Sequence, residues 1–209
     1  MSGPPTSAPT GPAGGAPASG TNALILVPSD GRVERQSVAD LSGVDLTTAN
    51  ALAVTYGEDA EAWLNDWYDD VGGPATTMAV LSPGEFTRST AATSAPSTQT
   101  LPGWGTVEAF DDATDFAYLG RRTREFLRRW AVTANQTVLT FETVSDLLDL
   151  VDCRTAFRFL HLYTRLTRAT GAHCWFHLDP AATEERTVRT LSPLFDETLA
   201  YHDGTWVRS

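Results

Sequence analysis

Residues 22–38 read NALILVPSDGRVERQSV, an apolar run that gives way to a polar loop containing one glycine. Short, nearly continuous apolar runs are typical of strands that are buried on both faces of a parallel sheet. Four further runs have this character, and they lie at 52–56, 77–81, 137–141 and 173–178. We therefore expect a central sheet whose first strand occupies residues 23–27.

Amphipathic helical patterns separate these strands. In EDAEAWLNDWYDDVGG, residues 58–73, apolar side chains recur at i, i+3, i+4 and i+7, and similar patterns lie at 111–131 and 153–171. A broken helix is expected at 184–195, and residues 197–209 predict two strands joined by an Asp-Gly turn. Alternating strands and helices predict an α/β fold: a doubly wound, mainly parallel sheet with helices on both faces and a C-terminal β-hairpin.

Two segments lack the apolar residues needed to form a core. Residues 1–21 consist of Pro, Gly, Ala, Ser and Thr after the first Met, and Asn22 begins the apolar pattern. We expect a disordered tail over 1–21 and one α/β domain over 22–209. Residues 87–105, TRSTAATSAPSTQTLPGWG, are predicted to be a flexible low-complexity insertion in that domain.

The charge composition is unusual. The chain has 26 acidic residues and a net charge of −11, and all 15 of its basic residues are Arg. At molar salt the Debye length falls to about 3 Å, so self-repulsion costs little there. We predict a protein from a halophile; the alternative is an acidic protein of a mesophile with a GC-rich genome.

Nothing in the sequence predicts export or membrane insertion. The first residues include neither a basic segment nor an apolar one, and no stretch of about 18 apolar residues occurs. We expect a cytoplasmic protein with no membrane contact. In that compartment the two cysteines, Cys153 and Cys174, are expected to be reduced.

The loop after the first strand is where a doubly wound sheet binds its ligand. A phosphate-binding loop reads GxxxxGK[ST], in which glycines expose backbone N–H groups and Lys contacts the outer phosphates. Here the loop has one glycine and two acids, and the chain contains no Lys. The weak candidates for contacting a nucleotide are Ser29, Gly31, Arg32 and Arg35.

Five stretches follow one another in an order that resembles a known family: NALILVPSDG, NALAVTYGEDAEAWLNDW, QTVLTFETVSDLLDLVDCRTAFRFLHLYTRLT, HCWFHLDPAA and TVRTLSPLFDETLAYHDGTW. In this order they resemble the RecA superfamily, and within it the KaiC-like branch. The chain is most similar to uncharacterised haloarchaeal proteins that keep this fold without an intact phosphate loop.

The resemblance implies which catalytic groups are missing. Where the family has a Walker B strand ending in Asp, this chain has VLTFE, which places Glu142 in the Asp position. The family's catalytic Glu follows the second strand, and Glu58 of YGED is the nearest match. Glu58 and Glu142 are thus weak catalytic candidates, and no cofactor is expected.

The resemblance predicts a pseudo-ATPase that acts as a regulatory or protein-interaction module; the alternative is a divergent protein that still binds or hydrolyses ATP with Mg²⁺. Assembly into a homo-oligomer is suggested by the resemblance alone.

A basic stripe is the main candidate for binding a partner. On a helix over 153–171, its members fall within a sector about 80° wide. One interpretation is a docking surface for an acidic protein or for nucleic acid. The net charge opposes attraction to phosphate, so we favour the other interpretation, in which Asp and Glu of this chain, such as those of SDLLDLVD at residues 145–152, neutralise the stripe. If the stripe does bind a partner, a protein is expected rather than nucleic acid. The stripe comprises Arg154, Arg158, His161, Arg165 and Arg168.

No metal site is expected. His173 and His177 lie on one face of the same predicted strand, where four residues separate them by about 13 Å. One ion cannot bridge that distance.

Overall fold

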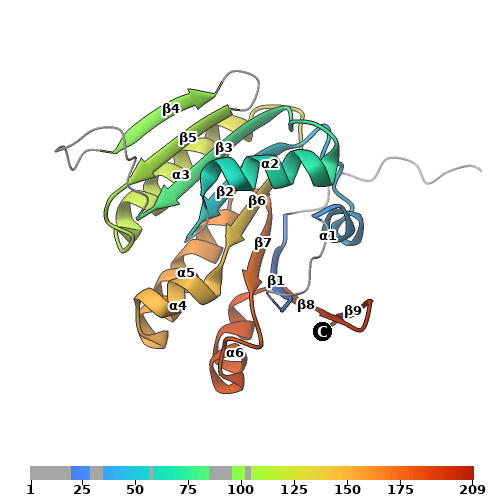
Figure 1. Cartoon of the computed structure of the whole chain (residues 1–209), viewed down its shortest axis with the longest axis vertical. Coiled ribbons are helices and arrows are strands. Elements are labelled where there is room, and N and C mark those ends of the chain that lie inside the picture. The colour runs from blue at the N-terminus through green and yellow to red at the C-terminus, as the bar shows by residue number, and fades with distance from the viewer. Residues whose placement is uncertain (1–19, 29–34, 57–58, 85–95, 102–104) are drawn as a thin grey trace, which may run out of the picture.

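The computed structural model describes residues 20–28, 35–56, 59–84, 96–101 and 105–209. In these residues one sheet of nine strands has the order β4-β5-β3-β2-β6-β7-β1-β8-β9 (Figure 1). Its strands are β1 (Asn22–Leu26), β2 (Asn50–Thr55), β3 (Thr77–Pro83), β4 (Ser97–Leu101), β5 (Gly105–Phe110), β6 (Thr137–Glu142), β7 (His173–Leu178), β8 (Glu197–His202) and β9 (Thr205–Arg208).

The seven strands from β5 to β8 in this order are parallel to one another, while β4 and β9 pair antiparallel at the two edges. The helices are α1 (Arg35–Ser42), α2 (Ala60–Val71), α3 (Phe116–Trp130), α4 (Val144–Leu150), α5 (Cys153–Arg168), α6 (Glu185–Leu191) and the 3₁₀ turn η1 (Ser192–Leu194). This arrangement confirms the predicted fold class: a doubly wound, mainly parallel α/β sheet with a C-terminal β-hairpin.

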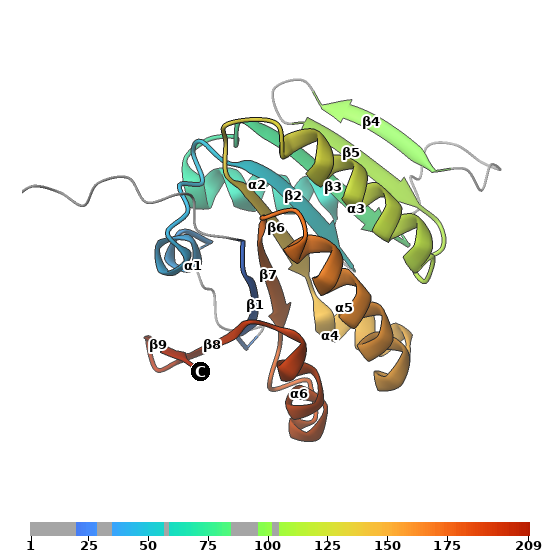
Figure 2. The same ribbon diagram turned by 180° about the vertical axis from the view of Figure 1, so that it is seen from behind.

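Helices cover both faces of the sheet, and each face has its own core. On one face, Trp63 and Trp67 of α2 and Val38 of α1 pack against sheet residues that include Trp175. On the other, α3, α4, α5 and α6 pack over an aromatic core around Phe141 (Figure 2). Because both faces are covered, β2 is buried along its whole length, as the continuous apolar runs predicted.

The helix boundaries follow from local chemistry. Asp59 caps α2 by accepting a hydrogen bond from the Glu61 N–H, and Gly72 ends the helix in the left-handed region at φ 79°. Thr143 caps α4, because its Oγ1 accepts a hydrogen bond from the Asp146 N–H at 3.1 Å. These caps fix where the loops at the sheet edges begin.

The predicted flexible insertion at 87–105 is wrong for residues 97–101, which form β4, and for Gly105, which begins β5. This strand pairs antiparallel with β5, from Ser97 opposite Ala109 to Leu101 opposite Gly105. Its STQTL sequence is rich in Thr, which favours strands, and an exposed edge position needs few apolar residues. The rest of the insertion, at 87–95 and 102–104, lies outside the described residues.

Two other boundaries differ from prediction. The helix α1 starts inside the stretch that the sequence predicts to be a polar loop. The predicted tail over 1–21 extends too far, because the Thr21 carbonyl accepts a hydrogen bond from the Cys174 N–H at 2.8 Å. The main part of that tail, 1–19, lies outside the described residues.

Candidate functional site

The carboxyl edge of the parallel strands is the site that the sequence predicts for a ligand. Four of its predicted residues, Ser29, Gly31, Arg32 and Glu58, lie outside the described residues. The two that the structure places are Arg35, the first residue of α1, and Glu142, the last residue of β6.

Arg35 is held against α2. Its Nη1 lies 2.8 Å from Asp70 Oδ2, and its guanidinium carbon is 5.2 Å from the centre of the Trp63 ring. The two side chains of this ion pair are only 12% and 9% exposed, so solvent screens the interaction little. The charge of Arg35 is therefore compensated inside the protein, and contacting a phosphate would require it to share or release Asp70.

Glu142 lies beside a histidine of the neighbouring strand. Because Phe141 pairs with Phe176, His177 follows next to Glu142, with His177 Nε2 at 3.7 Å from Glu142 Oε1. Nε2 is buried and has no hydrogen-bond partner among the described residues. Burial lowers the pKa of His177, Glu142 opposes this shift, and Arg35 adds to it. The imidazole is thus neutral at pH 7, and the carboxylate has a polar neighbour but no full ion pair.

The loop after β7 is tied to α4. Ser145 Oγ accepts a hydrogen bond from the Asp179 N–H at 2.9 Å, and Asp179 Oδ1 accepts from the Ala181 N–H at 2.7 Å. These contacts join the loop after β7 to α4 at the carboxyl edge. They were not predicted, because a hydrogen bond between residues 34 positions apart leaves no local pattern.

The residues of the predicted basic stripe are all exposed to solvent. All five of its residues, Arg154, Arg158, His161, Arg165 and Arg168, are exposed on the outer side of α5. Among them, Arg168 pairs with Asp196 through Nη2 and Oδ1 at 2.6 Å. The other three arginines form no ion pair with any residue in the described part of the chain.

Two of the three acids in residues 145–152, Asp146 and Asp152, have other contacts. Asp146 bonds Thr143. Asp152 caps α5, and its pKa is lowered first by hydrogen bonds from Thr155 and only weakly by Arg154. Neutralisation of the stripe by acids of this chain is therefore partial in the described residues: Arg168 pairs with Asp196, and Arg154 lies near Asp152.

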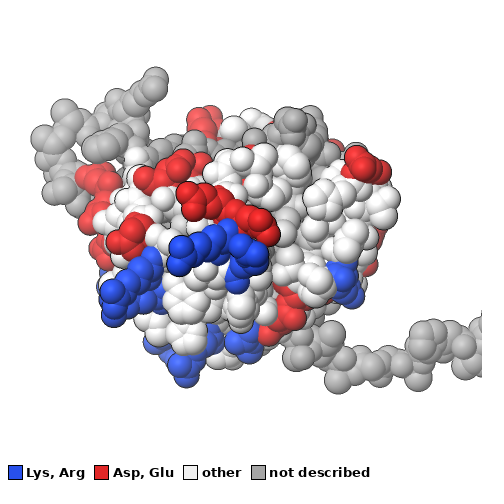
Figure 3. All heavy atoms as spheres, turned by 90° about the horizontal axis from the view of Figure 1, so that it is seen from below, with Lys and Arg blue, Asp and Glu red and all other residues white. Residues whose placement is uncertain are grey.

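The basic surface extends onto α3, which packs beside α5 through Phe116 and Phe159 and through a hydrogen bond between the Thr123 and Tyr163 hydroxyls. The two helices contain nine arginines and one acid, Glu125, so their net charge is +8. Because the whole chain is −11, the remainder carries −19. Seen from below, basic side chains gather over the lower half of the molecule and most acidic ones above them (Figure 3). We call the outer sides of α3 and α5 the arginine surface.

Metal and nucleophilic sites find no support from geometry in the described residues. No group of three or more His, Cys, Asp or Glu side chains there is placed to hold a metal ion. Cys153 and Cys174 are free thiols. Burial raises the pKa of Cys174 to about 12, so this thiol is not a nucleophile at neutral pH.

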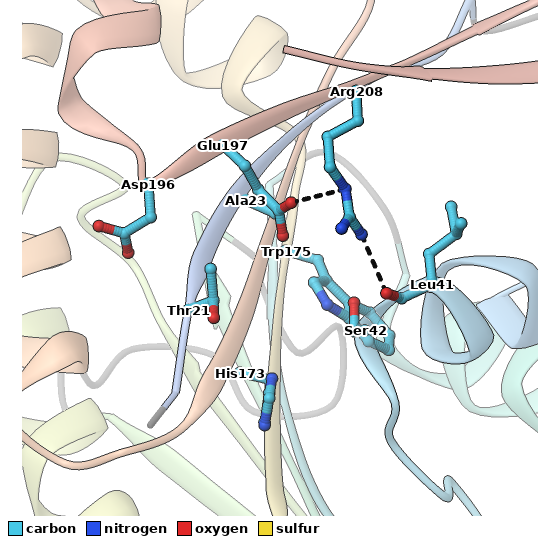
Figure 4. Close-up of a pocket in the computed structure, with 9 residues that line it drawn as sticks. All are labelled: Thr21, Ala23, Leu41, Ser42, His173, Trp175, Asp196, Glu197 and Arg208. Atoms are coloured by element: carbon cyan, nitrogen blue, oxygen red, sulfur yellow. Dashed lines mark hydrogen bonds and ion pairs between the residues drawn. The ribbon is translucent and has the colours of Figure 1, made fainter. Parts of the chain in front are cut away.

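The structure also has a pocket that the sequence did not predict. Its volume is about 280 Å³, and its lining includes His173 and Glu197, the first residues of β7 and β8 (Figure 4). Its polar lining includes His173, Glu197 and Arg208. The residues come from separate strands, so only the register of the sheet brings them together.

The comparisons with known proteins agree with the fold and leave the activity open. The model of a family described as a family of unknown function, DUF7504, matches residues 20–201. No curated protein matches the sequence. A solved structure, the uncharacterized protein PH0321 from Pyrococcus horikoshii in complex with an unknown peptide, superposes with a TM-score of 0.52 at 9% identity. The match covers 90% of this chain and 81% of that one.

A second solved structure, described as an ATPase domain, is more distant. It matches with a TM-score of 0.42 at 10% identity, over 88% of this chain and 70% of that one. At these identities the matches concern the fold and carry no residue roles. In the described part of the chain, no helix has both the length and the apolar character needed to cross a membrane.

Proposed function

The chain belongs to the family of unknown function DUF7504, and we propose that it is a non-catalytic RecA-like domain. It is a pseudo-ATPase that acts as a protein-interaction module in a halophile. Its partner is an acidic protein, which docks on the arginine surface of α3 and α5.

The observation that carries this proposal is the charge of the arginine surface. The two helices carry a net charge of +8 in a chain whose remainder carries −19. Arg122 and Arg168 pair with acids outside the helices, and the other seven arginines form no ion pair with a described residue. Exposed arginines that lack an acidic partner repel one another, and this costs stability unless another molecule neutralises them. Arg also binds carboxylates in a bidentate geometry, which supplies short-range contacts that survive screening better than long-range attraction does.

A protein partner fits this surface better than nucleic acid does. Phosphate backbones bind mainly through long-range attraction to a basic protein, and that attraction weakens steeply with salt. Here the net charge of −11 opposes it. The arginine surface also exposes Leu162, which is 66% accessible and offers an apolar contact among the charges.

The loss of ATP chemistry is supported by composition and by contacts. The chain has no Lys to contact the outer phosphates, and Glu142 stands where the resemblance implies an Asp. Arg35 is engaged by Asp70, and Glu142 faces His177. Each described group near the expected nucleotide site thus has a contact within the protein.

Titration calorimetry with ATP and Mg²⁺ in molar KCl tests the non-catalytic part of the proposal. We expect no saturable heat. Micromolar ATP binding, together with ATP turnover that Glu58→Gln abolishes, would contradict the proposal. That result would favour the alternative of an active ATPase.

Cross-linking and affinity capture at molar salt test the docking surface. The bait variant Arg154→Glu/Arg158→Glu/Arg165→Glu should lose a specific acidic protein that the wild type retains. The matched control is Arg186→Glu/Arg189→Glu, which reverses exposed arginines on α6 and should retain it. Circular dichroism confirms that each bait is folded. If the triple variant instead loses only salt-sensitive binding of duplex DNA, the nucleic-acid alternative replaces the proposal.

A further inference from the structure

The pocket shown in Figure 4 lies at the opposite edge of the sheet from the expected nucleotide site. His173 and Glu197 begin β7 and β8, which both run parallel to β1, so their positions mark the amino-terminal edge. Glu142, in contrast, ends β6. The pocket is therefore a separate site, and a ligand bound there need not compete with ATP.

The register of three strands forms its floor. Ala23 of β1 pairs directly with Trp175 on one side and with Glu197 on the other. Residues paired in this way project on the same face of the sheet, so the small Ala23 side chain lies between a large indole and a carboxylate. Figure 4 shows these side chains together with His173, which lies two residues before Trp175 at the start of β7. The hollow above Ala23 is thus bounded by an aromatic wall and by an acid.

Two polar groups in the pocket have capacity to bind a ligand. His173 is only 5% exposed, and neither of its ring nitrogens bonds a residue that the structure describes. Burial lowers the pKa of His173 and Glu197 opposes this, so the ring is neutral at pH 7 and keeps one nitrogen as an acceptor. Glu197 uses Oε2 to bind Arg208, while Oε1 has no hydrogen-bond donor among the described residues.

The position of Arg208 indicates which chemical class of ligand the pocket can bind. Its Nε lies 3.0 Å from Glu197 Oε2, and its Nη2 donates to the Leu41 carbonyl of α1 at 3.0 Å (Figure 4). A guanidinium from β9 therefore already occupies part of the site, at its mouth. The Arg208 side chain is 55% exposed, so solvent weakens this pair and another cation can compete for Glu197.

We propose that this pocket binds a small organic cation carrying an ammonium or guanidinium group. Glu197 supplies the counter-charge, the Trp175 indole flanks the cation, and His173 accepts a hydrogen bond from it. Arg208 competes with the ligand for Glu197. The volume of about 280 Å³ lies just below the usual range for drug-sized ligands, so the ligand is small.

Binding of methylguanidinium to the full chain tests the proposal, with N-methylurea as a neutral probe of nearly the same shape. The experiment follows the indole N–H resonances by NMR during titration, at a fixed KCl concentration at which the protein is folded. Methylguanidinium should shift the Trp175 indole resonance saturably, and N-methylurea should leave it unchanged. The resonance is assigned with Trp175→Phe.

Variants separate this site from general attraction of cations to an acidic protein. Arg208→Gln removes the competitor and should strengthen binding about tenfold. The control Arg189→Gln makes the same charge change at a pair exposed on α6 and should have no effect. Glu197→Gln should abolish binding. Because this variant could also disturb folding, the gain in Arg208→Gln is the decisive readout.

Three results would overturn the proposal. The first is absence of saturable binding to both the wild type and Arg208→Gln. The second is equal binding of N-methylurea, which would show that the charge is irrelevant. The third is an equal gain in Arg208→Gln and Arg189→Gln, which would show that the effect is not local.

Discussion

His177 is a residue whose environment sets a measurable property of the whole protein. Its Nε2 is buried without a hydrogen-bond partner in the described part of the chain, 3.7 Å from Glu142 Oε1. Burial lowers the pKa of this side chain despite the neighbouring carboxylate. In the unfolded chain the pKa returns to about 6.5. Below that value the unfolded state binds a proton that the folded state does not.

We expect the free energy of unfolding to fall as the pH drops from about 7 to about 5, and His177→Gln to reduce this loss. Each histidine with a depressed pKa contributes a slope of at most about 1.4 kcal/mol per pH unit, and above pH 7 it contributes nothing. Urea unfolding at several pH values, in constant KCl, measures the slope.

The control is His202→Gln, which changes an exposed histidine of β8 and should keep the wild-type slope. His173 contributes in the same direction, since burial lowers its pKa as well, so some slope remains in His177→Gln. Identical slopes in the wild type and His177→Gln would show that His177 is not held neutral.

For single residues, the sequence predicted positions better than contacts. It placed Glu142 at the end of a strand and His177 in another strand of the same sheet. Their proximity depends on the register that pairs Phe141 with Phe176, and Arg35 was not expected to bind Asp70. Such pairings are tertiary, so the local patterns of a single sequence do not contain them.

Between elements, a buried ion pair joins Glu108 of β5 to Arg122 of α3. Glu108 is 1% exposed, and Arg122 reaches it with Nε at 2.6 Å from Oε1 and Nη2 at 2.6 Å from Oε2. The Tyr118 hydroxyl also donates to this carboxylate. Burial and Glu108 together raise the pKa of Tyr118 to about 12. A buried charge is thus neutralised by a cation from the adjacent helix.

Arg122→Met should lower the free energy of unfolding by about 3–5 kcal/mol, because it leaves the Glu108 carboxylate buried without its cation. The double variant Glu108→Gln/Arg122→Met should lose less than the sum of the two single variants, since the stranded charge is removed. Urea denaturation at constant KCl measures all of these.

Arg128→Met is the matched control on α3, because Arg128 is exposed and has no ion pair with a described residue. It should change stability by no more than about 0.5 kcal/mol. A loss in Arg122→Met within about 1 kcal/mol of that control would contradict the importance of the buried pair.

The two strands that sequence patterns missed, β4 and β5, share a physical reason. β4 is an exposed edge strand with a polar sequence, and β5 carries the charged Glu108 in its middle, so neither shows a continuous apolar run. The strands β1, β2, β3, β6 and β7 are mostly buried and were all predicted within two residues at their ends. Burial on both faces is what makes a strand visible in sequence.

At the scale of the whole molecule, the chain has an excess of negative charge, and its charged residues are unevenly distributed. The helices α3 and α5 carry +8, while α2 carries four acids and no base. Three of those acids, Glu61, Asp66 and Asp69, are exposed. Repulsion within the acidic remainder opposes folding at low salt, and the arginine surface is too localised to cancel it.

We therefore expect the melting temperature to rise steeply between 0.1 M and molar KCl, as the Debye length falls from about 10 Å to about 3 Å. Each kcal/mol of relieved repulsion corresponds to about 2–4 °C for a domain of this size. Circular dichroism melts across a KCl series measure this, and sucrose at matched osmolality separates screening from general exclusion effects.

Two variants test whether repulsion among the acids is the cause. Asp66→Asn/Asp69→Asn removes two exposed negative charges from α2 and should lower the KCl concentration needed to reach a given melting temperature. Arg186→Gln, at an exposed position of α6 outside the arginine surface, makes the chain more acidic and should raise that concentration. An unchanged melting temperature between about 0.1 M and molar KCl would contradict halophilic adaptation. It would leave an acidic protein of a mesophile as the better explanation for a chain that contains 26 acids and no Lys.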